Sequence, residues 1–460
     1  MAAPILVWLR QDLRLADNPA LAAAAATGRA VLPVYILDDV APGHRRLGGA
    51  ARWWLHHALA SLRDALRAQG SSLLLRRGDS WPVIEELIAE TGTDAVFWNR
   101  RYEGWAIAQD RAIKAALQAR GLAARSFNGS LCHEPWTLTQ GIDRAYDRFS
   151  YFAGAWWEAG PPPEPLPAPS LTPGPRAPSL ALDELDLLPR RPDWAGGLRA
   201  TWRPGEPEAQ ATLAAFVGGP IRAYRQERHR PGNPHGTSRL SPHLRFGTIS
   251  PRQAWHAAAG ADPAVARDRM PAFQRQLVWR DYAYHLLYYH PGLADRPLRP
   301  AAEPAAVHDE VAFAAWCGGR TGYPLVDAGM RELWHTGWMP NRVRMVAASF
   351  LVRRLRVPWQ DGERWFWDTL CDADPANNAY GWQWVAGCTG ESARRPPVLN
   401  PITNGQRFDP DGSYVRRWVP ELARLPDTWL HRPFAAPHAA LAYAGVRLGE
   451  TYPLPIVELA

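Results

Sequence analysis

The segment 368–384, DTLCDADPANNAYGWQW, gathers carboxylate, amide and indole side chains within one short stretch. Amides both donate and accept hydrogen bonds, and indoles are large, oxidisable ring systems. Together these groups suit a flat heteroaromatic ligand with a polar tail. The alternative is structural: a capping turn of aspartate and asparagine that precedes a buried aromatic helix. The side chains concerned are Asp372, Asp374, Asn377, Asn378, Trp382 and Trp384.

The segment 236–251, GTSRLSPHLRFGTISP, is a candidate phosphate site. A turn that opens a helix presents backbone N–H groups, and here hydroxyls and a guanidinium stand beside them. The pattern is neither a Walker nor a Rossmann glycine motif. An ordinary helix cap before a short helix explains it equally well. The polar side chains are those of Thr237, Ser238, Arg239 and Ser241.

Two further segments place unusual side chains on one helical face. FQRQLVWRDYAYHL (273–286) brings Gln276, Trp279 and Arg280 together at i, i+3 and i+4. A base can stack on such an indole while the amide contacts its edge. The alternative is a buried aromatic helix whose arginine reaches solvent.

The segment GWMPNRVRMVAASFLVRR (337–354) places Asn341, Arg344 and Met345 on one face, and it predicts Pro340 at the first helical position. Its remaining arginines could meet phosphates, although such charges usually lie on a solvated face. They are Arg342, Arg353 and Arg354.

The elements that must position these residues follow two patterns. Short apolar runs at 4–10, 30–38, 71–78 and 94–102 alternate with helical stretches such as 51–70. This alternation predicts a parallel, doubly wound sheet whose ligands bind at the carboxyl ends of its strands.

The second half of the chain has a different pattern. The proline-rich stretch 160–204 predicts an extended connector. From about residue 206 onward, apolar residues recur at helical spacing. We therefore predict a Rossmann-like α/β domain over 1–130, a linker over 131–205 and an all-helical domain over 206–460.

Composition restricts the class of protein. A chain of 460 residues can hold two or three domains. The net charge of +7 favours an anionic partner such as nucleic acid, although an arginine-rich coding bias gives the same excess. The 4 cysteines lack CxxC spacing, which argues against a zinc site and a disulfide framework. With no apolar run of membrane-spanning length and no signal peptide, a soluble cytoplasmic protein is expected.

Taken in order, six segments resemble the photolyase/cryptochrome family, most closely the bacterial class I cyclobutane pyrimidine dimer (CPD) photolyases. The resemblance spans nearly the whole chain outside the proline-rich stretch. Their order makes the signal far stronger than any single motif. The segments are LVWLRQDLRLADNPAL (6–21), GTSRLSP (236–242), VWRDYAYHL (278–286), TGYPLVDAGMREL (321–333), GWMPNRVRMVAASFLV (337–352) and DADPANNAYGWQW (372–384).

The resemblance implies non-covalent FAD, in a U-shaped conformation, within the helical domain, and an antenna role for the α/β domain. Arg280 and Asn341 would line the isoalloxazine pocket, and Asn378 would lie beside flavin N5. Trp382 and then Trp359 would relay electrons to the flavin. The phosphates and ribitol would be held by Tyr224, Thr237, Ser238, Arg239, Leu240 and Ser241. The remaining implied contacts are Arg344 with Asp372, and Asp372 and Asp374 with the flavin and its adenosine.

The resemblance also implies a monomer that binds UV-damaged DNA. Light would excite FADH⁻, which would pass an electron to a dimer flipped from the duplex and recover it after the cyclobutane ring splits. Trp279 and Trp384 would sandwich the flipped bases, and Gln276 would contact them. Asn341 and Met345 would line this pocket. The basic face that meets the DNA includes Arg228, Arg342 and Asn404.

The chain departs from the family pattern at the lesion-contacting position. Gln276 stands where the family usually has glutamate, and an amide cannot share a proton with a thymine carbonyl as an acid can. The (6-4) photolyases and animal cryptochromes also carry glutamine there. They need a histidine pair in the next active-site helix, which GWMPNRVRM lacks, so (6-4) activity is not expected.

Three other positions also depart from the family pattern. ARRPPVLNP (393–401) lacks the usual aromatics, which leaves Arg394 and Arg395 as candidates for a phosphate contact. The distal relay tryptophan is missing near Ala306, and neither Trp316 nor Trp334 fits its position. The residues that would grip a folate antenna are replaced around 104–106, so a folate is not expected. A deazaflavin, another chromophore or none remain open.

The sequence therefore predicts a deoxyribodipyrimidine photo-lyase that repairs CPDs with light. Asn341, Met345 and Trp384 favour this enzyme, as does the lack of a long signalling tail after residue 440. The alternative is a blue-light photoreceptor with weak or no repair activity, which Gln276 and the altered 393–401 segment favour. A third possibility is a flavoprotein with neither activity.

Overall fold

The computed structural model describes residues 2–141, 144–261, 270–300, 307–392 and 398–459. Contacts between Cα atoms divide the chain into two compact units. The first unit comprises Met1–Trp194, Trp202–Ile221 and Ser238–Gly292. The second comprises Ala195–Thr201, Arg222–Thr237 and Leu293–Ala460. The boundaries predicted at residues 130 and 205 stay predictions.

A parallel sheet forms the centre of the α/β part of the first unit, with strand order β3-β2-β1-β4-β5. The predicted strands are confirmed as β1 (Ile5–Leu9), β2 (Ala30–Leu37), β3 (Leu74–Arg77) and β4 (Ala95–Asn99). β1, β2 and β4 are easily recognised in the sequence because a strand covered on both faces is apolar along nearly its whole length. Two strands were not predicted, β5 (Ala123–Phe127) and the short β6 (Thr172–Pro173), which pairs with β2.

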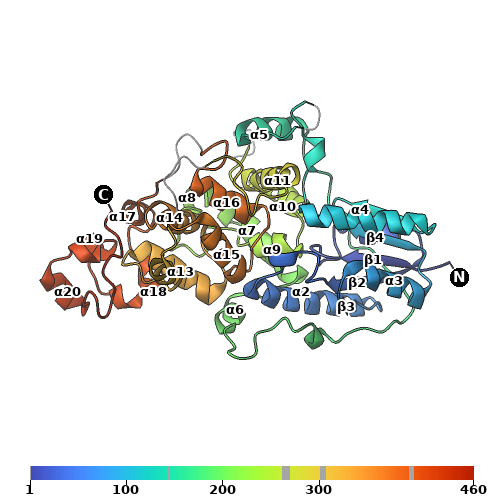
Figure 1. Ribbon diagram of the computed structural model, residues 1–460, viewed down its shortest axis with the longest axis horizontal. Coiled ribbons are helices and arrows are strands. Elements are labelled where there is room, and N and C mark those ends of the chain that lie inside the picture. The colour runs from blue at the N-terminus through green and yellow to red at the C-terminus, as the bar shows by residue number, and fades with distance from the viewer. Residues whose placement is uncertain (1, 142–143, 262–269, 301–306, 393–397, 460) are drawn as a thin grey trace. The chain divides into compact units, whose positions relative to one another are not determined.

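Helices alternate with these strands, as a doubly wound sheet requires. Figure 1 shows the strands lying among the helices of this region. The side chains of Asn18 and Asp79 cap the first and third of them. The helices are α1 (Pro19–Ala25), α2 (Gly49–Ala68), α3 (Ser80–Thr91) and α4 (Gly104–Ala119).

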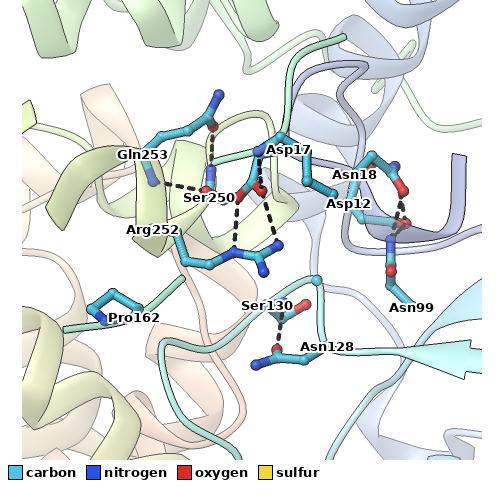
Figure 2. A network of polar contacts seen from close by, with 12 residues as sticks. Asp12, Asp17, Asn18, Asn99, Asn128, Ser130, Pro162, Ser250, Arg252 and Gln253 are labelled. Carbon is cyan, nitrogen blue, oxygen red and sulfur yellow. Dashed lines mark hydrogen bonds and ion pairs between the residues drawn. The ribbon is translucent and has the colours of Figure 1, made fainter. Parts of the chain in front are cut away.

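The segment 6–21 forms a polar network that ties the strand ends to a helix far along the chain (Figure 2). Asn99 Nδ2 donates to Asp12 Oδ2 over 2.6 Å and to Asn18 Oδ1 over 2.8 Å. Arg252, on α10 (Pro251–Ala259), donates through Nε to Asp17 Oδ2 over 3.0 Å. These buried, paired groups give the first of the six segments a structural role.

The rest of the first unit is helical: α5 (Phe149–Glu158), α7 (Glu206–Val217), α9 (Ser241–Phe246), α10 and α11 (Gln274–Tyr289). Asp281, at the middle of α11, accepts hydrogen bonds from His133 N over 3.0 Å and from Trp156 Nε1 of α5 over 3.0 Å. Burial raises the pKa of the Asp281 carboxyl, and these donors oppose that rise. The contacts hold α5 against α11.

The second unit is formed by helices, which confirms the predicted α/β plus all-α fold. Apolar side chains of α13 to α16 form its core. In the described part of the chain, no helix is long and apolar enough to cross a bilayer. The helices are α6 (Gly196–Thr201), α8 (Tyr224–Glu227), α12 (Glu310–Cys317), α13 (Pro324–Thr336), α14 (Asn341–Arg353), α15 (Trp359–Thr369), α16 (Asn377–Ala386), α17 (Pro401–Phe408), α18 (Ser413–Trp418), α19 (Asp427–Leu430) and α20 (His438–Ala444).

Two local expectations differ from the structure. Pro340 is the N-cap of α14 and not its first residue, because the extended ψ of 138° at Pro340 delays the helix to Asn341. The stretch 160–204 is not wholly extended, since Leu182–Leu185 forms a short 3-10 helix and Gly196–Thr201 is α-helical. A high proline content indicates an extended stretch, but short helical elements still form between the prolines.

Candidate functional site

The segment 368–384 connects α15 to α16 and contains the capping turn that was one of its two interpretations. Asp374 Oδ1 accepts from Ala376 N over 3.0 Å and from Asn377 N over 2.8 Å. The Asn377 side chain also donates to this oxygen, over 2.8 Å. Asp374 thus accepts hydrogen bonds from backbone N–H groups at the start of α16, and the Asn377 side chain supports it. The capping turn accounts for these two residues but not for the rest of the segment.

Asp372 is the residue of this segment whose carboxylate has an unpaired buried oxygen. It is 7% exposed, and its Oδ2 accepts from Arg344 Nη2 over 2.8 Å, the pairing that was predicted. Arg344 Nε donates to the carbonyl of Met339 over 2.7 Å, which fixes the guanidinium. Asp372 Oδ1 is buried and has no hydrogen-bond partner among the described residues. Because an unpaired buried acceptor costs about 1–3 kcal/mol, this oxygen marks a place for a ligand donor.

Asn378 is oriented by a residue that the sequence did not reveal. Its Nδ2 donates to Glu363 Oε1 over 2.8 Å and to the Glu363 carbonyl over 3.2 Å. Glu363 is on α15 and is 1% exposed. With Nδ2 bound to Glu363, Oδ1 is the amide atom left to accept from a ligand. A glutamate within an amphipathic helix has no signal that separates it from a surface residue.

Trp382 is enclosed by the neighbouring helices. Its ring centroid lies 5.0 Å from that of Phe366 and 6.1 Å from that of Trp316. Trp316 is fully buried and donates to the carbonyl of Ala347 over 3.0 Å. Trp316 therefore lies against Trp382, the tryptophan predicted to be the first of the relay, although the sequence did not predict a relay role for Trp316. Trp359, the predicted second relay residue, is buried at the start of α15.

A glycine makes room for Trp382. A Cβ added at Gly362 would overlap the six-membered ring of Trp382, so α15 requires glycine at this interior position. We expect Gly362→Ala to lower the free energy of unfolding by about 1–3 kcal/mol, the usual cost of overpacking. Gly381→Ala on α16 is the control, because its added Cβ meets open space. This variant should raise the free energy of unfolding by about 0.5–1 kcal/mol, since alanine favours the helix over glycine. Urea denaturation measures the free energy of unfolding of both variants. If the two variants change it equally, the close packing of Gly362 against Trp382 is contradicted.

Three arginines in the second unit form a group that we call the arginine cluster: Arg228, Arg342 and Arg407. Arg342 and Arg407 place their guanidinium carbons 4.7 and 5.1 Å from the centre of the Phe408 ring. Burial, followed by repulsion from Arg228 and Arg407, lowers the pKa of Arg342. Arg342 Nε is buried without a partner among the described residues. Such a desolvated cationic group is suited to an anion.

The cluster also affects a neighbouring histidine. Arg342 Nη2 lies 3.5 Å from His229 Nδ1. Burial lowers the pKa of His229 to about 4, and the three arginines add to that shift. His229 is therefore neutral near pH 7, and the positive charge here belongs to the arginines. The sequence identified Arg228 and Arg342 but not Arg407, which follows Asn404 by one turn of α17.

The first turn of α14 carries the two residues predicted to line the substrate pocket. Asn341 Nδ2 lies 3.6 Å from Met345 Sδ, which confirms their common face. Trp384, on α16, is partly exposed, and Asn404 donates through Nδ2 to the Asn400 carbonyl over 2.9 Å. Tyr224 is buried, with the guanidinium carbon of Arg228 5.4 Å from its ring centre.

Other predicted site residues belong to the first unit. On α11, Gln276 Nε2 donates to the Ala272 carbonyl over 3.1 Å, and the buried Arg280 donates through Nη1 to the Ser130 carbonyl over 2.6 Å. Trp279 is partly exposed.

The predicted phosphate segment spans the division between the units. Thr237 ends a segment of the second unit, and Ser238 begins a segment of the first. Leu240 is buried and N-caps α9, which starts at Ser241. Arg239 has a left-handed φ of 52°, and its guanidinium carbon lies 4.5 Å from the centre of the Trp202 ring. The predicted turn before a helix is therefore present.

Three of the discussed positions, Ala306, Arg394 and Arg395, lie outside the described residues. The predictions made for them stay predictions.

Comparisons with known proteins define the class to which this fold and site belong. A family model described as DNA photolyase matches residues 5–170, and one described as the FAD binding domain of DNA photolyase matches residues 273–460. The chain therefore has an FAD-binding domain, and the buried Asp372 and the amide of Asn378 fit a polar, planar cofactor.

Individual relatives define the family. A deoxyribodipyrimidine photo-lyase of Agrobacterium fabrum is 46% identical over 99% of this chain and 95% of its own. Cryptochrome-1 of Arabidopsis thaliana is 39% identical over 99% of this chain and 68% of its own. The chain belongs to the photolyase/cryptochrome family, as predicted.

Among solved structures, a class III photolyase from Agrobacterium tumefaciens superposes with a TM-score of 0.93 at 45% identity, covering 100% of this chain and 95% of its own. The predicted family is confirmed, but this relative is described as class III, whereas the sequence suggested class I.

Proposed function

We propose that this protein repairs cyclobutane pyrimidine dimers in DNA with light, as a deoxyribodipyrimidine photo-lyase. The observation that carries the proposal is the arginine cluster beside the start of α14. Arg342 is half-buried among cations, and the same helix presents Asn341 and Met345. A cationic group that can meet a phosphate, beside side chains that can contact a base, is what a flipped nucleotide needs. The photo-lyase of Agrobacterium fabrum and the FAD-binding domain support this assignment.

The second unit would hold FAD, which, when reduced and excited by light, supplies a one-electron donor. Asp372 Oδ1 would accept a hydrogen bond from the cofactor while Arg344 balances the carboxylate charge. Asn378 Oδ1 would accept from the N5 proton of reduced flavin, because Glu363 holds the amide nitrogen. Asp374 would face the adenosine. The other residues predicted to contact the cofactor stay predictions: Tyr224, Thr237 and Asn341 in the second unit, and Arg280 and the segment 238–241 in the first.

Lesion recognition would use aromatic and amide groups. Trp279 and Trp384 would stack on the flipped bases, and Gln276 would donate to a base carbonyl after leaving the Ala272 carbonyl that it binds here. Arg228, Arg342, Asn404 and Arg407 would meet the backbone.

Trp382 would pass electrons to the flavin, with Trp359 as the predicted second residue. Trp316, which contacts Trp382, is a second candidate. A second chromophore and a monomeric state stay predictions.

The experiment that tests the proposal uses reduced protein mixed with a UV-damaged oligonucleotide. Restored thymine absorbance under blue or near-UV light, but not in the dark, is expected. Trp279→Ala should lose this activity, and Gln276→Glu should retain it. No light-dependent restoration by the wild type would overturn the proposal.

The alternative function is a blue-light photoreceptor with weak or no repair. Gln276 and the similarity to a protein named cryptochrome-1 favour it. It predicts FAD binding and light-driven reduction without restoration of thymine.

A further inference from the structure

Phe149 and Trp279 form a close and nearly parallel aromatic stack. Their centroids are 3.5 Å apart and their planes differ by 5°. Phe149 is the first residue of α5 and is 4% exposed, whereas Trp279 on α11 is partly exposed. One face of the proposed base-stacking indole is therefore covered by a ring from another helix.

Further contacts restrain the same two rings. The ring of Tyr282 lies 5.8 Å from Phe149 and 5.8 Å from Trp279, edge-on to both. Arg275, one turn before Trp279 on α11, places its guanidinium carbon 5.4 Å from the centre of the Phe149 ring. The Asp281–Trp156 hydrogen bond holds α5 against α11 and so fixes the backbone that carries the Phe149 ring. The plane of Trp279 is thus set by neighbours and not by its own rotamer preference alone.

We infer that Phe149 is a positioning residue for lesion recognition, acting through Trp279. The inference rests on the proposed function, in which Trp279 stacks on a flipped base. A base that stacks on Trp279 must use the face turned away from Phe149. Because the stack fixes the indole before binding, the base meets an ordered platform and less side-chain freedom is lost. Phe149 should therefore increase the preference for damaged over undamaged DNA.

The variants separate the aromatic stack from simple filling of space. Phe149→Leu keeps an apolar side chain but removes the ring, whereas Phe149→Tyr keeps it. Phe152→Leu is the matched control. Like Phe149, Phe152 lies on α5 and packs against Tyr282, with ring centroids 5.2 Å apart. It differs in belonging to another part of the ring cluster. Should Phe149→Leu not fold, Phe149→Met replaces it.

The readout is the ratio of the Kd for an undamaged duplex to the Kd for the same duplex with one thymine dimer. We expect Phe149→Leu to lower this ratio about tenfold, equivalent to about 1.4 kcal/mol. Phe149→Tyr should keep the wild-type ratio, and Phe152→Leu should keep it even if the protein is less stable. Loss of stability alone lowers both affinities together and leaves the ratio unchanged.

Two results would overturn this inference without affecting the proposed function. One is an unchanged ratio of Kd values in Phe149→Leu, and the other is an equal fall of this ratio in Phe149→Leu and Phe152→Leu. If the wild-type protein shows no preference for the damaged duplex, the proposed function fails as well, and that result is visible before any variant is made.

Discussion

Replacing Arg342 with glutamine is expected to weaken binding to DNA of any sequence about tenfold and to reduce the salt slope by about one. Arg342 lies in the arginine cluster, and the groups that perturb its pKa, apart from burial, are cations. A phosphate would relieve this repulsion, and its counterions would be released on binding. Titration of a labelled duplex at several salt concentrations measures both quantities.

The matched control is Arg364→Gln. Arg364 is an exposed arginine of α15 in the same unit and pairs with Asp361, so its charge is already balanced. The two variants carry the same change in net charge. A difference between them in DNA affinity or salt slope therefore comes from where the arginine lies. Equal, small effects on the salt slope would remove the arginine cluster from the DNA interface.

The second large effect is expected at the buried ion pair. Arg344→Met should lower the free energy of unfolding by about 3–5 kcal/mol, because it leaves the Asp372 carboxylate buried without its cation. The protein should also retain less FAD, since the carboxylate then has no fixed orientation. Urea denaturation and the visible absorbance of the purified protein measure the two effects.

The double variant Arg344→Met/Asp372→Asn separates stability from cofactor binding. A neutral amide needs no cation, so the double variant should recover most of the stability. It should not recover FAD binding, because Asp372 Oδ1 has lost its charge. If Arg344→Met alone is as stable as the wild type, the pair has no structural role.

The parts of the fold that were predictable are those with one dominant periodic signal. β1, β2 and β4 are apolar on both faces, and α14 repeats its apolar residues at helical spacing. β5 was missed because AARSF is partly exposed and not continuously apolar, so only its pairing with β4 defines it. A strand specified by its neighbour cannot be found from its own residues.

The site shows the same limit. Residues in ordered motifs, such as Asp372 and Arg344, could be paired in advance because the motif carries the contact. Glu363, Arg407 and Phe149 could not, since each meets the residue that it affects across two separate helices. A single sequence gives such residues no distinguishing pattern. Asp374 forms the capping turn, whereas its predicted contact with the cofactor stays a prediction.

The central claim is tested most directly with an oligonucleotide that contains one defined thymine cyclobutane dimer. Reduced, FAD-loaded protein is illuminated with it, and the intact and repaired strands are separated and counted, beside a dark sample. Light-dependent conversion to the undamaged strand, with several turnovers per protein molecule, is the predicted result. A dimer that persists while the protein binds the DNA and its flavin is reduced would contradict the repair function and favour a photoreceptor.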